Sequence, residues 1–305
     1  MKPILGILGA TGVGKSKTSL LVAKRFGCDI ISADSMQIYR GMDIGTAKLP
    51  VEEREGIVHH LIDVVNPDQP FSSWDFAQLA NSIINANQEN LPLLCGGTGF
   101  YVDSLLKPLD FRVDEKTLDL RAEMQRLFES DGVDPLLERL KKIDEPTFLT
   151  IDKSNVKRVI RAIEIASFGE KKSEGQRDKK DAIFASTLVI LTRERASLVE
   201  KIHQRVDEMF EQGLVGEVEN LFEKYPDSNL QSFQAIGYKE IIAHLKGECS
   251  LNEAREQIKT ATRQYSKRQN TYFRRMNATW IDVENKTQEQ IADEICLLYE
   301  KNNAL

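Results

Sequence analysis

The chain has 305 residues, of which 41% are hydrophobic and 29% charged, and its formal net charge is −6. This composition excludes a disordered or collagen-like protein, and the length leaves room for one large domain or two smaller ones. No apolar stretch approaches the roughly 20 residues of a membrane span. Met1-Lys2-Pro3 leads into the first predicted strand without a signal peptide. We therefore expect a cytoplasmic protein that does not bind a membrane.

The first hundred residues alternate between short apolar segments and amphipathic ones. The predicted elements are a strand at 3–9, a helix at 15–26, a strand at about 28–32, a helix from Ser73 to Gln88 and a strand from Leu91 to Cys95. This alternation is typical of a parallel sheet with crossover helices. Ligands bind at the carboxyl ends of such strands, so we expect the loops 9–16, 33–40 and 96–99 to form one site.

From about Asp114 the sequence changes to charged amphipathic helix, and we predict a helical insertion domain at 112–181 within a core formed by 1–111 and 182–305. The insertion ends in the polar run 169–181, for which we expect a mobile loop because it has little to bury. The elements predicted after it are a strand at 183–191, helices at 194–212, 215–224, 234–246 and 251–275, a strand at 279–283 and a terminal helix.

The first loop matches the complete phosphate-loop pattern G-x-x-x-x-G-K-[ST]. Its residues are Gly9, Ala10, Thr11, Gly12, Val13, Gly14, Lys15 and Ser16. Backbone N–H groups of such a loop and the start of the following helix surround an anion, while Lys15 neutralises phosphates and Ser16 holds Mg²⁺. The alternative is an ordinary glycine-rich turn. The position between an apolar strand and an amphipathic helix favours a di- or triphosphate site and an α/β, P-loop NTPase-like fold.

The second loop carries Asp34, which would lie beside the phosphate loop. A partly desolvated carboxylate there suits a general base. The alternative is that Asp34 caps a turn or positions magnesium through water.

The third loop, 96–101, offers two glycines and the hydroxyl of Thr98, but its strand ends without the Asp that phosphate-loop ATPases place opposite magnesium. Asp63 is a possible substitute. We therefore expect a protein that binds phosphates without the full set of groups for their hydrolysis.

A basic helix is the second strong feature. Cations recur every four residues at Arg255, Lys259, Arg263 and Lys267, followed by Arg268, Arg274 and Arg275, with only Glu253 and Glu256 opposing them in 253–275. The alternative is a solvated helix surface. A second cluster, at Lys153, Lys157, Arg158 and Arg161, favours nucleic-acid binding over that alternative.

Six blocks together resemble the bacterial tRNA dimethylallyltransferase family, in the right order and over nearly the whole chain. They are the phosphate loop, 34–48, 60–64, 96–101, 234–240 and 262–269. Members transfer a dimethylallyl group from its diphosphate to the N6 amine of the adenosine following the anticodon, in tRNAs that read codons beginning with U. The resemblance implies a prenyltransferase with the tRNA anticodon stem-loop and dimethylallyl diphosphate as partners and Mg²⁺ as cofactor, and we expect a monomer.

The resemblance also implies roles for individual residues. Lys15, Ser16 with magnesium, and Arg205 would take up negative charge as the carbon–oxygen bond breaks. Asp34 would accept the proton of the adenine amine, and Thr98 would position the reacting groups. The base would have to be extruded into the pocket.

The resemblance implies contacts with tRNA for three segments and for Arg121, and the charge pattern predicts such contacts for the basic helix. The residues are Asp34, Ser35, Met36, Gln37, Arg121, Lys157, Arg158, Val159, Ile160, Arg161, Gln234, Ala235, Ile236, Gly237, Tyr238, Lys239, Arg263, Lys267 and Arg268. Gln234 stands where some relatives carry Arg, which leaves a direct phosphate contact there open.

Three other hypotheses fit parts of the chain. A small-molecule kinase would keep Lys15 and magnesium but needs no basic helix. A nucleotide-gated nucleic-acid-binding protein would use the basic helix without transfer chemistry. A prenyltransferase acting on free adenine nucleotides would dispense with most of the insertion. The tRNA prenyltransferase hypothesis alone uses the phosphate loop, Asp34 and the basic helix together.

Overall fold

The computed structural model describes residues 3–87, 89–107, 115–167 and 184–303. The chain divides into two compact units: the core unit, formed by 1–107 with 182–305, and the insertion, 108–181. The expected division differs from this one only at its first boundary. The polar run 169–181 lies outside the described residues.

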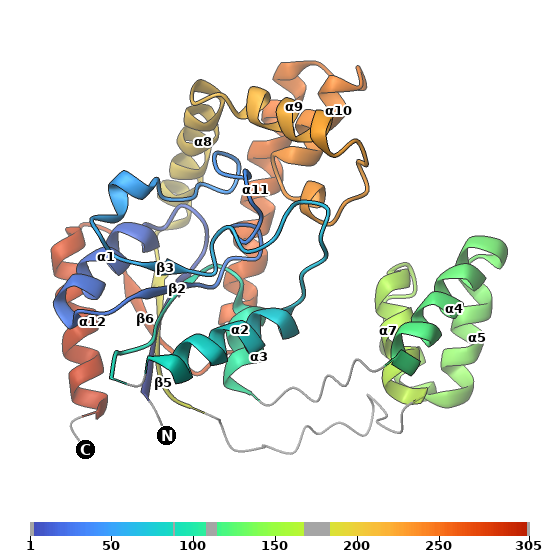
Figure 1. Cartoon of the computed structure of the whole chain (residues 1–305), viewed down its shortest axis with the longest axis horizontal. Coiled ribbons are helices and arrows are strands. Elements are labelled where there is room, and N and C mark those ends of the chain that lie inside the picture. Colours follow the sequence, from blue (N-terminus) through green and yellow to red (C-terminus); the bar gives the residue numbers. More distant parts are fainter. Residues whose placement is uncertain (1–2, 88, 108–114, 168–183, 304–305) are drawn as a thin grey trace. The chain divides into compact units, whose positions relative to one another are not determined.

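The core unit is built on one parallel sheet of six strands in the order β3-β2-β4-β1-β5-β6 (Figure 1). The strands are β1 (Pro3–Gly9), β2 (Ile30–Ser32), β3 (His59–His60), β4 (Leu93–Gly96), β5 (Ala185–Thr192) and β6 (Thr279–Asp282). In the centre of the sheet Leu5 of β1 lies opposite Leu93 of β4 and Thr187 of β5. Strands buried on both faces need apolar residues at successive positions, which explains the nearly unbroken apolar sequence of β1.

Helices cover both faces of this sheet. Successive side chains of a strand point to opposite faces, and accordingly Ile4 and Leu8 belong to one hydrophobic core while Leu5 and Ile7 belong to the other. The first core takes residues from α2 (Ser73–Ala86), α3 (Gly99–Leu106) and α11 (Leu251–Phe273). The second core takes residues from α1 (Lys15–Phe26) and α12 (Gln288–Asn303), which lie side by side in Figure 1.

Three further helices join α11 at one end of the core unit (Figure 1). They are α8 (Arg195–Glu211), α9 (Leu214–Lys224) and α10 (Tyr238–Leu245). The prediction of one helix over 234–246 was wrong in its first turn: the 3-10 helix η2 (Ser232–Gln234) is followed by Gly237 at φ 101°, a left-handed conformation that a continuous α-helix does not contain. The short elements α3, β3 and the 3-10 helix η1 (Val51–Arg54) were not predicted.

The insertion has a hydrophobic core of its own. Its helices are α4 (Glu115–Asp131), α5 (Asp134–Ile143), α6 (Glu145–Thr150) and α7 (Val156–Ser167). Met124, Leu136, Leu140 and Ile163 are fully buried in its centre. The insertion therefore forms a helical unit, as the amphipathic pattern predicts.

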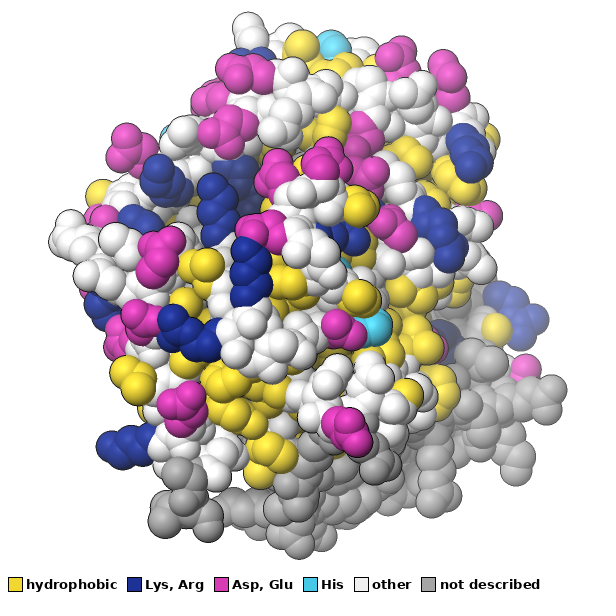
Figure 2. All heavy atoms as spheres, turned by 60° about the vertical axis from the view of Figure 1, so that its left-hand side comes forward, with side chains coloured by type: hydrophobic (Ala, Val, Ile, Leu, Met, Phe, Trp, Pro, Cys, Tyr) yellow, Lys and Arg dark blue, Asp and Glu magenta, His cyan; other side chains and the backbone are white. Residues whose placement is uncertain are grey.

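The surface carries charges of both signs. On the face drawn in Figure 2, Lys and Arg side chains lie among Asp and Glu side chains, as expected from 41 basic and 47 acidic residues. Within the described ranges, none of the helices combines the length and the apolar character needed to cross a bilayer.

Candidate active site

A cavity of about 340 Å³ opens at the carboxyl ends of the central strands, and residues of the core unit line it. The three predicted loops, α8, α11 and the segment 234–239 all contribute. The lining residues include Thr11, Lys15, Ser16, Asp34 to Gln37, Gly45 to Ala47, Cys95, Gly96, Arg205, Met209, Gln234 to Ile236, Lys239, Tyr265, Arg268 and Gln269. The loops that parallel-sheet topology predicts to converge therefore do so.

The phosphate loop adopts a conformation that glycine makes possible. Gly12 and Gly14 have φ values of 82° and 102°, in the left-handed region that is open to glycine at no steric cost. Helix α1 begins directly after Gly14, whose position carries no side-chain cap. The N–H groups of the first helical turn, which bear the positive end of the helix dipole, are therefore available to an anion.

Two cations face the cavity in a setting that destabilises their charge. Burial lowers the pKa of Lys15 to about 8, and its Nζ donates a 2.9 Å hydrogen bond to the carbonyl of Ala10. Burial also lowers the pKa of Arg205, while the nearby Asp34 carboxylate acts in the opposite direction. A bound anion would stabilise the charged forms of both side chains and so raise both pKa values again. Buried cations of this kind are typical of a phosphate site.

Thr11 connects the phosphate loop to two helices. Arg205 of α8 donates a 2.7 Å hydrogen bond from Nη1 to Thr11 Oγ1. The backbone N–H of Thr11 donates to Gln269 Oε1 of α11 at 2.9 Å, and Gln269 Nε2 donates to the carbonyl of Gly97 at 2.9 Å. One buried amide therefore links the first and third loops.

The second and third loops are joined through Thr98. Its Oγ1 accepts a 3.1 Å hydrogen bond from the N–H of Ser35 and donates to Ser35 Oγ at 3.3 Å. Asp34 Oδ1 accepts a 2.9 Å hydrogen bond from the N–H of Met36. Asp34 therefore caps a turn. Its carboxylate also lines the cavity, which is the position that a general base requires.

Tyr265 lines the same cavity as Asp34 and is influenced by its charge. Burial, followed by the charge of Asp34, raises the pKa of Tyr265 to about 12, while Thr98 and Gln269 partly offset this effect. The phenol is therefore protonated at neutral pH and can donate a hydrogen bond. Its position on α11 is three residues after Thr262 and four before Gln269, a spacing that places all three side chains on the cavity face of the helix.

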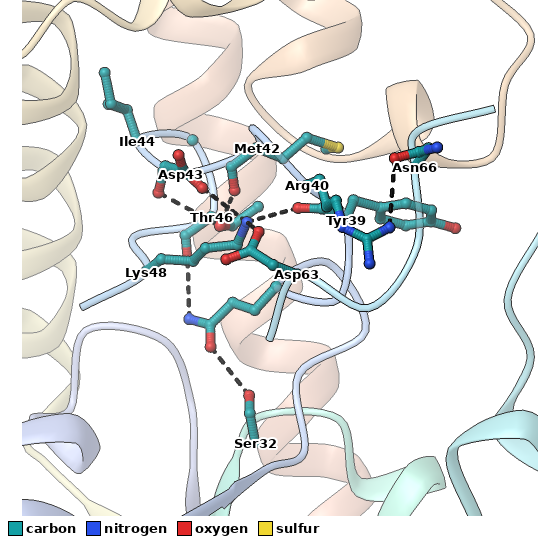
Figure 3. Close-up of polar contacts among 12 residues, drawn as sticks. Ser32, Tyr39, Arg40, Met42, Asp43, Ile44, Thr46, Lys48, Asp63 and Asn66 are labelled. Atoms are coloured by element: carbon teal, nitrogen blue, oxygen red, sulfur yellow. Dashed lines mark hydrogen bonds and ion pairs between the residues drawn. The ribbon is translucent and has the colours of Figure 1, made fainter. Parts of the chain in front are cut away.

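The loop 37–48 is held by a buried ammonium group (Figure 3). Lys48, with a side chain 3% exposed, donates to the carbonyl of Tyr39 at 2.6 Å, to Asp43 Oδ1 at 2.7 Å and to Asp63 Oδ1 at 2.6 Å. Gln37 accepts from Ser32 and donates to the carbonyl of Thr46. Asp63 is thus engaged by Lys48 and does not line the cavity, which argues against it as the substitute for the missing Asp opposite magnesium.

Most candidate tRNA residues of the core unit either line the cavity or are exposed on α11. Asp34 to Gln37, Gln234 to Ile236, Lys239 and Arg268 line the cavity, and Arg263 and Lys267 are exposed on α11. Tyr238 is fully buried, so its side chain has a packing role. Gly237 supplies the left-handed turn before α10.

The regular series of four cations on α11 does not form one free face. Lys259 Nζ lies 2.9 Å from Asp207 Oδ1, and Arg255 lies 3.9 Å from the same atom, with its guanidinium over the ring of Phe210. The first half of the series therefore holds α8 against α11. Arg263 and Lys267 are the members that remain exposed.

The candidate residues of the insertion are buried, paired with Glu164 or exposed. Val159 and Ile160 are 0% and 5% exposed within its core, so their side chains are not placed to reach a ligand. Arg121 and Arg161 both bond the carboxylate of Glu164. Lys157 and Arg158 are exposed.

Two residues that hold loops of the site were not singled out from the sequence. Gln269 and Glu217 lie far along the chain from the loops to which they are hydrogen-bonded. A polar residue on the apolar face of a helix is the signal that could have identified Gln269.

Comparison with known proteins gives consistent matches. A model of the IPP transferase family matches residues 37–276, and one of the isopentenyl transferase family matches residues 3–63. The chain is 45% identical over 293 residues to a tRNA dimethylallyltransferase of Alkaliphilus oremlandii, covering 93% of this chain and 92% of that protein. It is 42% identical over 287 residues to the Bacillus subtilis protein of the same name, covering 92% and 91%.

Solved structures agree with these matches. A tRNA isopentenylpyrophosphate transferase from Staphylococcus epidermidis has a TM-score of 0.74 and 36% identity, covering 99% of this chain and all of that one. A eukaryotic dimethylallyltransferase acting on tRNA has a TM-score of 0.80 and 27% identity, covering 100% of this chain and 77% of that one.

Proposed function

The chain belongs to the IPP transferase family, and on this premise we propose that it transfers the dimethylallyl group of dimethylallyl diphosphate to the N6 amine of the adenosine that follows the anticodon, in tRNAs that read codons beginning with U. The observation that carries this proposal is the single cavity shared by the phosphate loop, Arg205 and Asp34. Lys15 and Arg205 are the cations that would bind the leaving diphosphate. Asp34 is the carboxylate that would act on the amine, and all three line the same cavity.

The diphosphate would occupy the phosphate-loop side of the cavity. Lys15 and Ser16 at the start of α1 line this cavity together with Arg205. As the bond between the allylic carbon and the diphosphate oxygen breaks, negative charge builds on that oxygen. Groups already arranged around it stabilise this charge more than they stabilise the bound substrate, which lowers the barrier.

The adenine amine would approach from the side of Asp34. Its nitrogen forms the new bond to the allylic carbon, and the proton that it loses passes to the Asp34 carboxylate. The hydrogen bond from Met36 fixes Oδ1 of Asp34, and Thr98 fixes the loop through Ser35. A carboxylate held in this way keeps its position relative to the leaving group without reorganisation.

We propose Mg²⁺ as the cofactor, held by the Ser16 hydroxyl. Mg²⁺ commonly takes one or two protein ligands and completes its shell with substrate phosphates and water. The hydroxyl of Ser16, next to Lys15 in the cavity lining, would supply one such protein ligand. Bound there, the ion would neutralise part of the diphosphate charge.

The tRNA would be bound by the cations that the fold leaves exposed. Arg263 and Lys267 lie on α11, and Arg268 of the same helix reaches the cavity. The adenosine must leave its stack to enter a cavity lined by Met36 and Ile236, at a cost of a few kcal/mol that is smallest in a single-stranded loop.

Transfer of radiolabelled dimethylallyl diphosphate tests the proposal, with unmodified tRNA carrying A-A-A at the end of the anticodon as one acceptor and AMP as the other. We expect label in the tRNA alone. Label in AMP would point to a prenyltransferase of free nucleotides. Label in neither acceptor, together with ATP turnover, would point to a kinase or a nucleotide-gated binding protein.

A further inference from the structure

The loop 43–45 binds a carboxylate of the protein itself. Glu217 of α9 accepts hydrogen bonds from three consecutive backbone N–H groups: Asp43 at 2.9 Å and Ile44 at 2.7 Å to Oε2, and Gly45 at 3.1 Å to Oε1. Successive N–H groups that converge on one point form an anion-binding concavity. Glu217 fills this concavity and so fixes the path of the loop.

Glu217 binds a second segment at the same time. The hydroxyl of Tyr238 donates to Glu217 Oε1 at 2.6 Å. Burial and the charge of Glu217 raise the pKa of Tyr238 well above its usual value, so the phenol stays protonated and remains a donor. Its ring also packs on Gly45, where an added Cβ would lie only 2.5 Å from a ring carbon.

The two segments that meet at Glu217 both contribute to the cavity lining. Gly45, which donates to Glu217, lines the cavity with Thr46 and Ala47, and the lining residues 234–236 and Lys239 flank Tyr238. Glu217 itself is not among the lining residues. Its hydrogen bonds go to the loop 43–45 and to Tyr238, and none of the contacts described for it reaches the phosphate loop.

Lys48 also holds this loop, through the side chain of Asp43. Its ammonium binds Asp43 Oδ1 and the carbonyl of Tyr39 (Figure 3). The backbone N–H of Asp43 binds Glu217 while its side chain binds Lys48. The loop is therefore fixed by a buried cation and by an anion at neighbouring points, which leaves it little freedom to move relative to α9 and α10.

We infer that Glu217 is a positioning residue for the acceptor substrate, because it holds the loop 43–47 and the segment 234–239 in the arrangement that receives the adenosine. This inference rests on the proposed function. It separates the two substrates: loss of Glu217 should disturb the acceptor side of the cavity and leave the diphosphate side, built on Lys15 and Arg205, intact.

The test compares the steady-state constants of Glu217→Ala with those of the parent protein. We expect KM for tRNA to rise about tenfold or more, with KM for dimethylallyl diphosphate changed less than twofold. Sodium formate should lower the raised KM for tRNA, because the anion can enter the space left beside three N–H groups and a phenol. Glu219→Ala, an exposed position of the same helix, is the matched control and should show neither effect.

Tyr238→Phe serves as a second variant, since it removes one hydrogen bond and keeps the carboxylate in the loop. It should raise KM for tRNA by a smaller factor and should not respond to formate. An unchanged KM for tRNA in Glu217→Ala, or an equal rise for both substrates without a formate response, would overturn the inference while the parent protein remains active. A parent protein without transfer activity would contradict the proposed function and this inference with it.

Discussion

Thr11 and Gln269, 258 positions apart in the sequence, are joined by a 2.9 Å hydrogen bond from the backbone N–H of the phosphate loop to the side-chain Oε1 on α11. The same amide donates to the carbonyl of Gly97. Helix α11, which carries the exposed cations Arg263 and Lys267, is thereby fixed to the phosphate loop and to the loop after β4. Contact between Gln269 and Gly97 is so close that a Cβ at Gly97 would lie 2.3 Å from the amide nitrogen.

Replacing Gln269 by Leu removes both hydrogen bonds from a buried position. Each backbone group that loses its partner costs about 1–3 kcal/mol, and the phosphate loop loses its link to α11. We expect kcat/KM for dimethylallyl diphosphate to fall about tenfold or more. Gln264→Leu, at an exposed position of the same helix, is the control and should behave like the parent protein. Equal activity of the two variants would show that the link is dispensable.

Replacing Asp34 by Asn keeps an oxygen that can accept the hydrogen bond from Met36 but removes the base. We expect single-turnover transfer to slow on the order of 100-fold or more, with the Kd for tRNA little altered. Filter binding with the same tRNA measures the second quantity. A collapse of tRNA affinity in parallel with the rate would assign Asp34 to recognition.

The lowered pKa of Lys15 predicts how diphosphate binding depends on pH. The side chain is charged below about pH 8 and loses its charge above it, so affinity for dimethylallyl diphosphate should weaken as the pH rises from 7 to 9, by at most about tenfold per pH unit. Titration calorimetry at both ends of this range measures the effect. Lys15→Arg, whose cation does not titrate in this range, should show a flatter dependence; an equally steep dependence would place the titration elsewhere.

The pairing of Asp207 with the first cations of α11 predicts unequal effects of removing charge along that helix. Lys267→Ala removes an exposed cation, so we expect weaker tRNA binding and a slope of log K against log salt reduced by about one. Lys259→Ala removes a cation 2.9 Å from Asp207 and should leave that slope unchanged. Filter binding across a series of salt concentrations compares them, and identical slopes would argue against the division of the helix.

Local patterns in the sequence predict much of the fold. The apolar run of β1, the phosphate loop and the amphipathic α1 are continuous in the chain, and parallel-sheet topology then brings the loops after β1, β2 and β4 together. The interruption at Gly237 was missed because the apolar spacing of 234–246 looks helical, and only the positive φ reveals the turn.

Contacts between distant segments are the part that local patterns do not contain. Glu217 and Gln269 act through side chains that reach backbone groups more than 150 positions away. The spacing of Arg255, Lys259, Arg263 and Lys267 on one helix predicts a common face, but not that Asp207 of α8 neutralises its first half. The partner of each charge is set by tertiary packing.

The most direct test of the account is mass spectrometry of the anticodon-loop fragment of tRNA after incubation with the protein, Mg²⁺ and dimethylallyl diphosphate. A single cavity that holds both the diphosphate and an extruded adenosine predicts the added mass of one dimethylallyl group on the adenosine that follows the anticodon. With Asp34→Asn the modified fragment should form about 100-fold more slowly. An unmodified fragment, or a group added at another nucleotide, would contradict it.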